Sequence, residues 1–345
     1  MLKYMSQVTK YCKQYNIQLS ELVSLLINKE GVNTNFSANR VRFNLNNLGN
    51  LNLMFSVQNT SESIFSFIKN NLVINNIILG TISNLVEDSC EVFYTRKEGK
   101  VLCFNPNSRS SCHGCKFCYS PTSSDDDKII LTSEIYNSFI NWIEKEKVEN
   151  LSHLEQIAVV TGCFKNDKQI IDYLSKVRET ATRLSFSGEL LFFGMPLEES
   201  TFYHLEKIKP INLCFTIECF ENRDILISND KRAKIVDVKH KMNIAKSLGI
   251  KTNFSYIVGL DSINVIEENF KSLKNSINCF PIISVYQTDT NRIKYRNKDA
   301  SSIDYYLKIR QIIEDIMEDT KFRPKTWNNY RSLWREYFKD ETLQD

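Results

Sequence analysis

Apolar and polar positions follow two alternating rhythms from about residue 98 onward. Short runs of almost continuous apolar residues, such as 156–161 (QIAVVT) and 189–194 (ELLFFG), predict strands that are buried on both faces. Longer segments between them place apolar residues on one stripe, as Ile135, Phe139 and Ile143 do at a spacing of four. That spacing is typical of amphipathic helices, so the chain predicts alternating strands and helices.

Six strand–helix units can be counted. The predicted strands are 101–107, 156–161, 189–194, 212–218, 252–259 and 281–288, and the helices begin near residues 132, 167, 198, 232, 263 and 302. This alternation favours a parallel sheet with right-handed crossovers. We therefore expect an α/β fold, a partial (β/α)6 TIM-like barrel, two units short of a full barrel. The competing fold, a doubly wound sheet, normally carries a glycine-rich phosphate turn after its first strand, whereas this turn carries three cysteines.

The N-terminal part of the chain follows a different pattern. A helical stretch near residues 5–28 precedes short alternating segments, of which 41–55 (VRFNLNNLGNLNLMF) reads as strand, turn and strand. We expect residues 1–97 to form a small α+β domain, a wing or a lid, ahead of the barrel at residues 98–290.

Residues 291–345 are expected to form a C-terminal helical cover. Its last part, 322–338 (FRPKTWNNYRSLWREYF), is rich in aromatic residues and arginine. Two interpretations stay open at this point. The aromatic side chains form a stripe that packs a helix on the barrel, or the segment is a substrate lid that carries Arg323, Arg331 and Arg335.

Composition narrows the possible classes of protein. The 345 residues are 42% hydrophobic and 25% charged, the balance of a folded globular chain rather than a disordered one. A net charge of +3 gives no reason to expect a nucleic-acid partner. No apolar run is long enough for a membrane span, and the N-terminus lacks the apolar core of a secretory signal. We expect a cytoplasmic protein, in which the 10 cysteines stay free or bind metal.

Three cysteines crowd into SSCHGCKFCYSP as a C-x2-C-x2-C run, namely Cys112, Cys115 and Cys118. A loop of this length can gather three sulfurs around one centre. Zinc suits such a site if Cys103 or His113 supplies a fourth ligand. An iron–sulfur cluster also suits it, and three cysteines without an obvious fourth fit a 4Fe-4S cluster that leaves one iron open. The spacing alone leaves both metals possible.

Together these features resemble the radical S-adenosylmethionine (SAM) enzyme superfamily over residues 98–290. The resemblance rests on Phe117-Cys118-Tyr119 closing the cysteine loop after the first strand, TGCF (161–164), Glu218 at the end of the fourth strand, and AKSLGIKTNFSYIVGLDS (245–262). One feature departs from the family pattern, which usually has three residues between the first two cysteines, whereas this chain has two. Cys103 is therefore an alternative first ligand. We prefer Cys112, because Cys103 lies inside a predicted strand.

The resemblance implies two cofactors, a 4Fe-4S cluster on Cys112, Cys115 and Cys118, and SAM. The SAM contacts that it implies are Phe117 beside the adenine, Thr161 and Gly162 near the methionine amino group, Glu218 at the ribose hydroxyls or the amino group, Arg223 at the carboxylate, and the backbone of Val258 and Gly259 at the adenine.

The resemblance also implies an activity. The family cleaves SAM reductively to a 5′-deoxyadenosyl radical, which abstracts hydrogen from a substrate, here expected to be a small molecule or a peptide. The electron would come from a donor such as flavodoxin or ferredoxin. The alternative function is a non-catalytic zinc or iron–sulfur binding module that acts with a partner protein. The six strand–helix units favour the enzyme, since a metal-binding module needs no such scaffold.

Overall fold

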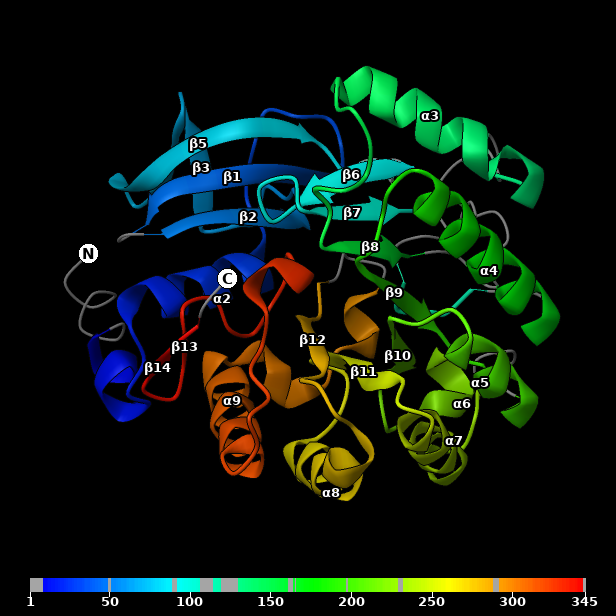
Figure 1. Cartoon of the computed structure of the whole chain (residues 1–345). Coiled ribbons are helices and arrows are strands. Elements are labelled where there is room, and N and C mark those ends of the chain that lie inside the picture. Colours follow the sequence, from blue (N-terminus) through cyan, green and yellow to red (C-terminus); the bar gives the residue numbers. More distant parts are fainter. Residues whose placement is uncertain are drawn as a thin grey trace.

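The structure is a computed structural model in which two β-sheets organise the chain (Figure 1). It describes residues 9–48, 51–88, 92–105, 114–118, 130–160, 164, 166–196, 198–228, 232–287 and 292–343.

The larger sheet confirms the predicted partial barrel. Its seven strands lie in the order β12-β11-β10-β9-β8-β7-β6, and β7 to β12 run parallel. Their bounds are β6 Phe93–Arg96, β7 Val101–Phe104, β8 Gln156–Val159, β9 Glu189–Gly194, β10 Ile211–Glu218, β11 Lys251–Val258 and β12 Ile282–Val285. The edge strand β6, which the sequence pattern did not predict, pairs antiparallel with β7.

Helices cover the outer face of this curled sheet (Figure 1). They are α3 Ile135–Glu146, α4 Asp167–Arg183, α5 Glu199–Glu206, the short α6 Arg223–Leu226, α7 Ile235–Ser247, α8 Ile263–Leu273 and α9 Ile303–Met317. All except α6 were predicted. Polar side chains cap two of their N-termini: Asn166 accepts from the Gln169 N–H before α4, and Ser302 accepts from the Asp304 N–H before α9. Within the described part, no helix is long and apolar enough to cross a membrane.

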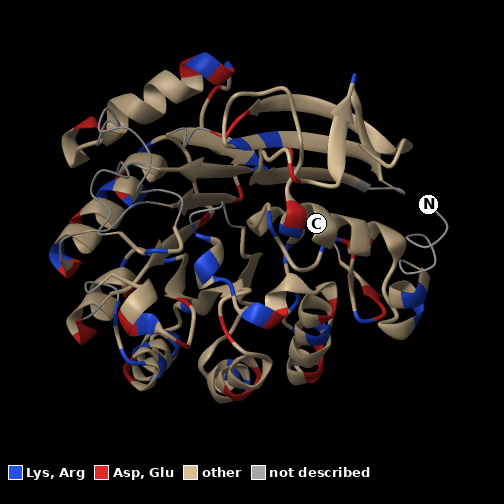
Figure 2. Cartoon of the chain, turned by 180° about the vertical axis from the view of Figure 1, so that it is seen from behind, with Lys and Arg blue, Asp and Glu red and all other residues tan. Residues whose placement is uncertain are grey.

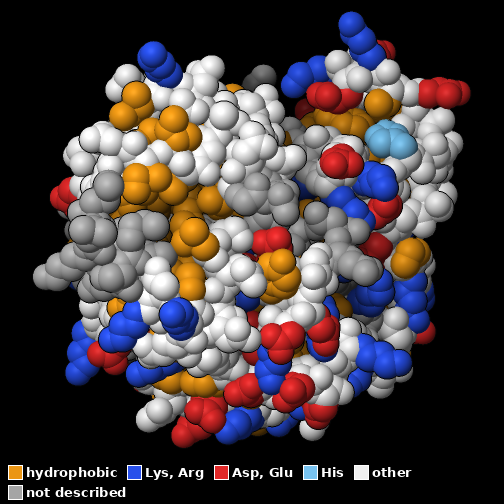
Figure 3. All heavy atoms as spheres, turned by 90° about the vertical axis from the view of Figure 1, so that its left-hand side faces the viewer, with side chains coloured by type: hydrophobic (Ala, Val, Ile, Leu, Met, Phe, Trp, Pro, Cys, Tyr) orange, Lys and Arg blue, Asp and Glu red, His pale blue; other side chains and the backbone are white. Residues whose placement is uncertain are grey.

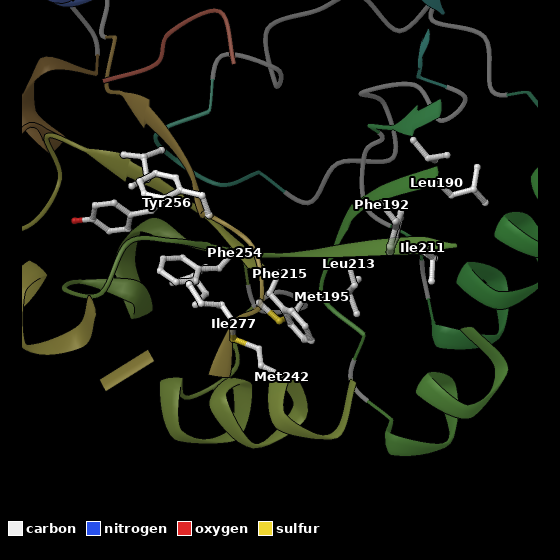
Figure 4. Packing of buried hydrophobic residues seen from close by; sticks show 14 of the residues in the cluster. Leu190, Phe192, Met195, Ile211, Leu213, Phe215, Met242, Phe254, Tyr256 and Ile277 are labelled. Atoms are coloured by element: carbon white, nitrogen blue, oxygen red, sulfur yellow. The ribbon is translucent and has the colours of Figure 1, made fainter. Parts of the chain in front are cut away.

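The main hydrophobic core lies between the sheet and these helices. Figure 4 shows Phe215 and Phe254 from neighbouring strands above Met242 of α7, with Phe192 of β9 farther along the sheet. The intervening residues of these strands point to the opposite face of the sheet, away from the helices. Five of these, Cys103, Ala158, Leu191, Cys214 and Ile282, form a separate small apolar group inside the curve of the sheet. The interior of the half-barrel is therefore partly filled by side chains, as in complete barrels.

The smaller sheet is antiparallel, with strand order β2-β1-β5-β4-β3. Its strands are β1 Arg40–Leu48, β2 Leu51–Gln58, β3 Phe65–Ile68, β4 Asn71–Ile74 and β5 Ile77–Glu87. The β1–β2 pair confirms the predicted strand–turn–strand. One face packs on helix α2, Leu19–Glu30, through Val23 and Ile27. The long helix predicted near residues 5–28 is interrupted, because Asn16 has a φ of +47° that a helix cannot contain.

Residues 319–343, called the C-terminal segment below, contain no α-helix. They hold a 3-10 turn at Thr326–Asn328 and a short pair of strands, β13 Tyr337–Phe338 and β14 Glu341–Thr342. The prediction that a helical stripe of aromatic residues packs here is therefore wrong. Pro324 is one reason, because proline and the residue before it disfavour helix. The helical part of the predicted cover is α9.

The C-terminal segment joins the two free edges of the larger sheet. Beside β12, the Val285 N–H donates to the Arg331 carbonyl at 2.8 Å. Beside β6, Nη1 of Arg96 donates to the Asn328 carbonyl at 2.7 Å, and the Tyr94 and Tyr330 rings lie 6.1 Å apart. The open side of the half-barrel is thus bridged by a segment that is distant in sequence.

Charges of both signs are spread over the outer helices (Figure 2), in agreement with the small net charge. Figure 3 shows the face on the left of Figure 1, where hydrophobic side chains form several groups among charged and polar ones. Exposed apolar side chains are normal on a protein surface, much of which is apolar.

Candidate active site

Most of the predicted site residues lie at one edge of the larger sheet. The carboxyl ends of parallel strands meet there, and this is the edge at which barrel enzymes bind their ligands. The cysteine loop follows β7, Glu218 ends β10, and Gly259 follows β11. Cys112, Thr161 and Gly162 lie outside the described residues.

Residues 114–118, called the cysteine turn below, are fastened to the loop after β10. The Cys118 N–H donates to the Cys115 carbonyl at 3.0 Å, which closes the turn. The Lys116 N–H donates to the Leu226 carbonyl at 2.9 Å. The Ser228 N–H points at the Cys115 sulfur at 3.5 Å. A donor of this kind stabilises a thiolate, which is the form that binds metal.

An apolar group lies beneath the cysteine turn. Phe117 is 8% exposed and packs with Cys219, Leu226, Ile227, Leu260 and Tyr286, and the half-buried Cys115 and Cys118 lie against the same group. Among the described residues, no three Cys, His, Asp or Glu side chains lie close enough together to hold a metal ion. The third cysteine of the run, Cys112, lies outside them.

Glu218 holds an uncommon backbone conformation at the end of β10. Its φ is +68°, and the pairing register with β11 shifts between Thr216 and Glu218. Its carboxylate accepts a hydrogen bond from the Ser255 hydroxyl at 3.1 Å. A positive φ is unfavourable for a residue with a side chain and persists where the surroundings impose it, often at functional sites. The position thus agrees with a binding role for Glu218.

Arg223 is committed to the backbone of its own loop. Its Nη1 donates to the carbonyls of Ile217 and Cys219 at 2.5 and 2.6 Å, and its Nη2 donates to the carbonyl of Ala233 at 3.2 Å. Only Nε is buried without a partner. Burial lowers the pKa of this guanidinium. Arg223 therefore fixes the loop after β10 and keeps two donors for a ligand, Nε–H and the second N–H of Nη2.

Asp261 lies in the stretch 245–262 and was not among the predicted site residues. Its fully buried carboxylate accepts from the N–H groups of Phe220 and Glu221 at 2.8 and 2.9 Å, and from the Tyr256 hydroxyl at 2.7 Å. Burial raises its pKa to about 6. This residue ties the loop after β10 to the loop after β11. The signal in the sequence was an aspartate three residues after the end of a buried strand.

The backbone at Val258 and Gly259 is enclosed from both sides. The Val258 carbonyl accepts from the Tyr286 N–H, and the Gly259 carbonyl accepts from the Asn297 N–H, both at 2.8 Å. Gly259 has a φ of +122°, and a Cβ added there would lie 2.8 Å from Cβ of Tyr286. Glycine is required at this position because a side chain has neither the conformation nor the space.

A cavity of about 810 Å3 opens at the opposite end of the sheet. Glu189, Asn212 and Lys251, which lie near the starts of their strands, line it together with the C-terminal segment. None of the predicted site residues is among its lining residues. The carboxyl ends of the strands, where the predicted residues gather, remain the better candidate for chemistry.

Comparison with protein-family models finds no match, and neither does comparison with curated proteins. Solved structures do match. Coproporphyrinogen III oxidase (HemN) from Escherichia coli, described as a radical SAM enzyme, has 15% identity and a TM-score of 0.41, over 60% of this chain and 50% of that one. SuiB from Streptococcus suis, bound to SAM, has 13% identity and a TM-score of 0.43, over 64% and 49%.

A third match is the hydrogenase maturase HydG from Carboxydothermus hydrogenoformans, with 14% identity and a TM-score of 0.48 over 66% of this chain and 55% of that one. The matched part spans about half the length of these proteins. Likenesses of this degree concern the fold, and the function has to be inferred from this chain's own residues.

Proposed function

We propose that this protein is a radical SAM enzyme that binds a 4Fe-4S cluster through Cys112, Cys115 and Cys118 and cleaves SAM reductively. The setting of the cysteine turn carries the proposal. Cys115 and Cys118 lie half-buried against an apolar group at the carboxyl edge of a half-barrel, with the Ser228 N–H on the Cys115 sulfur. Thiolates, an apolar setting and N–H donors to sulfur suit an iron–sulfur cluster.

When bound, the cluster supplies the electron that breaks the bond between the sulfonium and the adenosyl carbon of SAM, and the resulting 5′-deoxyadenosyl radical takes hydrogen from the substrate. The chain's own residues bind and orient SAM. Glu218, held by Ser255, is assigned to the ribose hydroxyls or the amino group. The enclosed backbone at Val258 and Gly259 is assigned to the adenine, with Phe117 beside it.

Two further assignments complete the SAM site. Thr161 and Gly162 are assigned to the methionine amino group. Arg223 keeps Nε–H and the second N–H of Nη2 for the carboxylate of SAM, because its other three N–H groups donate to backbone carbonyls. The substrate is proposed to be a small molecule or a peptide, and the electron to come from a donor such as flavodoxin or ferredoxin.

Anaerobic reconstitution with iron and sulfide tests the ligand assignment. We expect the wild-type protein to bind about four irons, as a 4Fe-4S cluster requires, and to show the visible absorption of such a cluster. Cys115→Ala and Cys118→Ala should lose both signals. The matched control is Cys103→Ala, because Cys103 is a fully buried cysteine inside β7 and burial raises the pKa of its thiol.

Three outcomes decide the matter. Loss of iron in Cys115→Ala and Cys118→Ala, with iron retained in Cys103→Ala, supports the proposal. Loss of iron in Cys103→Ala but not in Cys112→Ala would make Cys103 a ligand. Stoichiometric zinc with no uptake of iron would replace the enzyme with the metal-binding module.

A further inference from the structure

Arg331 differs from the other arginines of the C-terminal segment. Arg323 forms a two-pronged ion pair with Glu341, at 2.6 and 2.8 Å. The buried Arg335 donates to the carbonyls of Asn329 and Tyr330. Among the described residues, none accepts a hydrogen bond or forms an ion pair with the half-buried guanidinium of Arg331. Of the three arginines predicted for a lid, only Arg331 has a guanidinium group without a hydrogen-bond or ion-pair partner among the described residues, and this group can bind a ligand.

The backbone places Arg331 at the carboxyl edge of the sheet. The Val285 N–H at the end of β12 donates to the Arg331 carbonyl at 2.8 Å, and Ser332 forms a bridge with Ser284. Tyr286, which follows Val285, belongs to the apolar group that also contacts Cys118. Arg331 therefore lies beside the proposed cofactor site and away from the cavity at the opposite end.

Charged groups around Arg331 come from several elements. Its electrostatic neighbours are Arg40, Asp88, Cys118 and Glu218. Arg40 and Arg42 of β1 also lie near Asp88. Burial raises the pKa of Asp88, but the charges of these arginines help to lower it below its ordinary value. Arg40 forms the ion pair with Asp88 at 3.3 Å. One aspartate thus faces three guanidinium groups.

The two carboxylates near Arg331 already have partners in the described part of the chain. Asp88 pairs with Arg40, and the Glu218 carboxylate accepts a hydrogen bond from the Ser255 hydroxyl. Withdrawing an unmatched guanidinium from water is costly, and a bound anion removes that cost.

We propose that Arg331 binds the carboxylate or phosphate group of an anionic substrate at the carboxyl edge of the half-barrel. The inference rests on the proposed function, because it takes the reaction to occur beside Cys118 and Glu218. A planar guanidinium suits this role, since it can donate two parallel hydrogen bonds to either group. The carboxylate of SAM has the same chemistry, so the experiment must separate the two sources.

Inorganic phosphate is the probe for the first experiment, which uses the full chain without a cluster. We expect calorimetric titration to show saturable binding to the wild-type protein and at least tenfold weaker binding to Arg331→Gln. Arg331→Lys should bind with intermediate affinity. Arg323→Gln is the matched control from the same segment and should bind as the wild type does. Equal phosphate affinity in the wild type and Arg331→Gln would overturn the proposal.

Thermal unfolding separates binding from a structural role. Without phosphate, Arg331→Gln should unfold at the wild-type temperature or above it, because the change removes a cation that lacks a partner. With saturating phosphate, only the wild type should gain stability. A lower melting temperature for Arg331→Gln in both conditions, with no change in phosphate affinity, would make Arg331 a structural residue.

The second experiment assigns the anion. In the reconstituted protein, a substrate site predicts that SAM affinity is unchanged by Arg331→Gln and that phosphate and SAM bind together. Loss of SAM affinity in Arg331→Gln, with competition between phosphate and SAM, would overturn the substrate assignment and give Arg331 to the SAM carboxylate. Because phosphate binding needs no iron, a failure of the proposed function is distinguishable from a failure of this inference.

Discussion

Two neighbouring loops hold single residues in conformations that most residues avoid. Glu218 and Gly259 have φ angles of +68° and +122°, and they lie where β10 and β11 end. For Glu218 this conformation costs on the order of 1–3 kcal/mol and persists only because the surroundings impose it, whereas glycine adopts a positive φ at no steric cost. Ser255 holds the Glu218 carboxylate, and Asn297 holds the Gly259 carbonyl. At this scale, the site is defined by backbone shape as much as by side-chain chemistry.

Gly259→Ala tests the close approach at this edge. We expect a loss of about 3 kcal/mol in the free energy of unfolding, because the new Cβ meets Tyr286 and the positive φ is strained. Gly99→Ala is the control, since Gly99 has a φ of +89° but nothing within 4 Å of an added Cβ. Gly99→Ala should lose about 1 kcal/mol in the free energy of unfolding, because the new side chain is strained by the positive φ but meets no other atom. Equal losses in urea unfolding would contradict the predicted clash.

Asp261 predicts a specific pH dependence of stability. Burial raises its pKa to about 6 from the ordinary value of 3.8, so the folded protein holds this proton more tightly than the unfolded chain does. The stabilisation is complete below pH 3.8 and is lost as the pH rises through 6. The difference between these two pKa values corresponds to about 3 kcal/mol in the free energy of unfolding.

Comparison with Asp261→Asn isolates this effect from other carboxyl groups. Between about pH 4 and pH 6, the wild-type free energy of unfolding should fall relative to that of the variant. Urea unfolding at several pH values measures the difference. Parallel pH profiles would show that Asp261 titrates as it does in the unfolded chain.

The positions of the predicted site residues in the fold were more predictable than their hydrogen-bond partners. Cysteine spacing indicated Cys115 and Cys118, and the resemblance to the radical SAM superfamily indicated Glu218 and Gly259. The partners of Arg223 were not predictable, because every backbone offers carbonyl acceptors and only the fold decides which are near. Asp261 was overlooked for the same reason, since two of its three donors are backbone N–H groups.

At the scale of elements, continuous apolar runs predicted the parallel strands well. The run at 189–194 matches β9 residue for residue. The strand β6 was missed because its four residues, Phe93–Arg96, are half-buried and give no apolar run. The extended course of the C-terminal segment was missed because its aromatic residues have a spacing that a helix could also use. Its contacts with β6 and β12 come from residues distant in sequence.

A buried carboxylate anchors the C-terminal segment to α2. Glu21 is 1% exposed and accepts from the N–H groups of Arg335, Glu336 and Tyr337 and from Nη1 of Arg310. We expect Glu21→Gln to lower the free energy of unfolding by about 3 kcal/mol, because it leaves a buried arginine without part of its counter-charge.

Glu341→Gln is the matched control for this anchor, since Glu341 forms an exposed ion pair with Arg323. Such a pair contributes about 0.5 kcal/mol. Urea unfolding of both variants measures the two losses. A loss in Glu21→Gln no larger than that in Glu341→Gln would contradict the anchoring role.

At the scale of the molecule, the smaller sheet and the C-terminal segment lie around one edge of the larger sheet, the edge formed by the carboxyl ends of its parallel strands. The cysteine turn, the loops after β10 and β11, Arg40 of β1 and Arg331 of the C-terminal segment all lie around the carboxyl ends of the parallel strands. The half-barrel supplies the scaffold, and parts remote in sequence complete its open side. This convergence supports one reaction centre at this edge.

Formation of 5′-deoxyadenosine is the measurement that tests the central claim most directly. The reconstituted protein is reduced anaerobically with dithionite in the presence of SAM, and the products are separated by chromatography. We predict 5′-deoxyadenosine from the wild-type protein and none from Cys118→Ala. Equal amounts from both proteins, or none from a wild-type protein that carries the cluster, would contradict the proposal of a radical SAM enzyme.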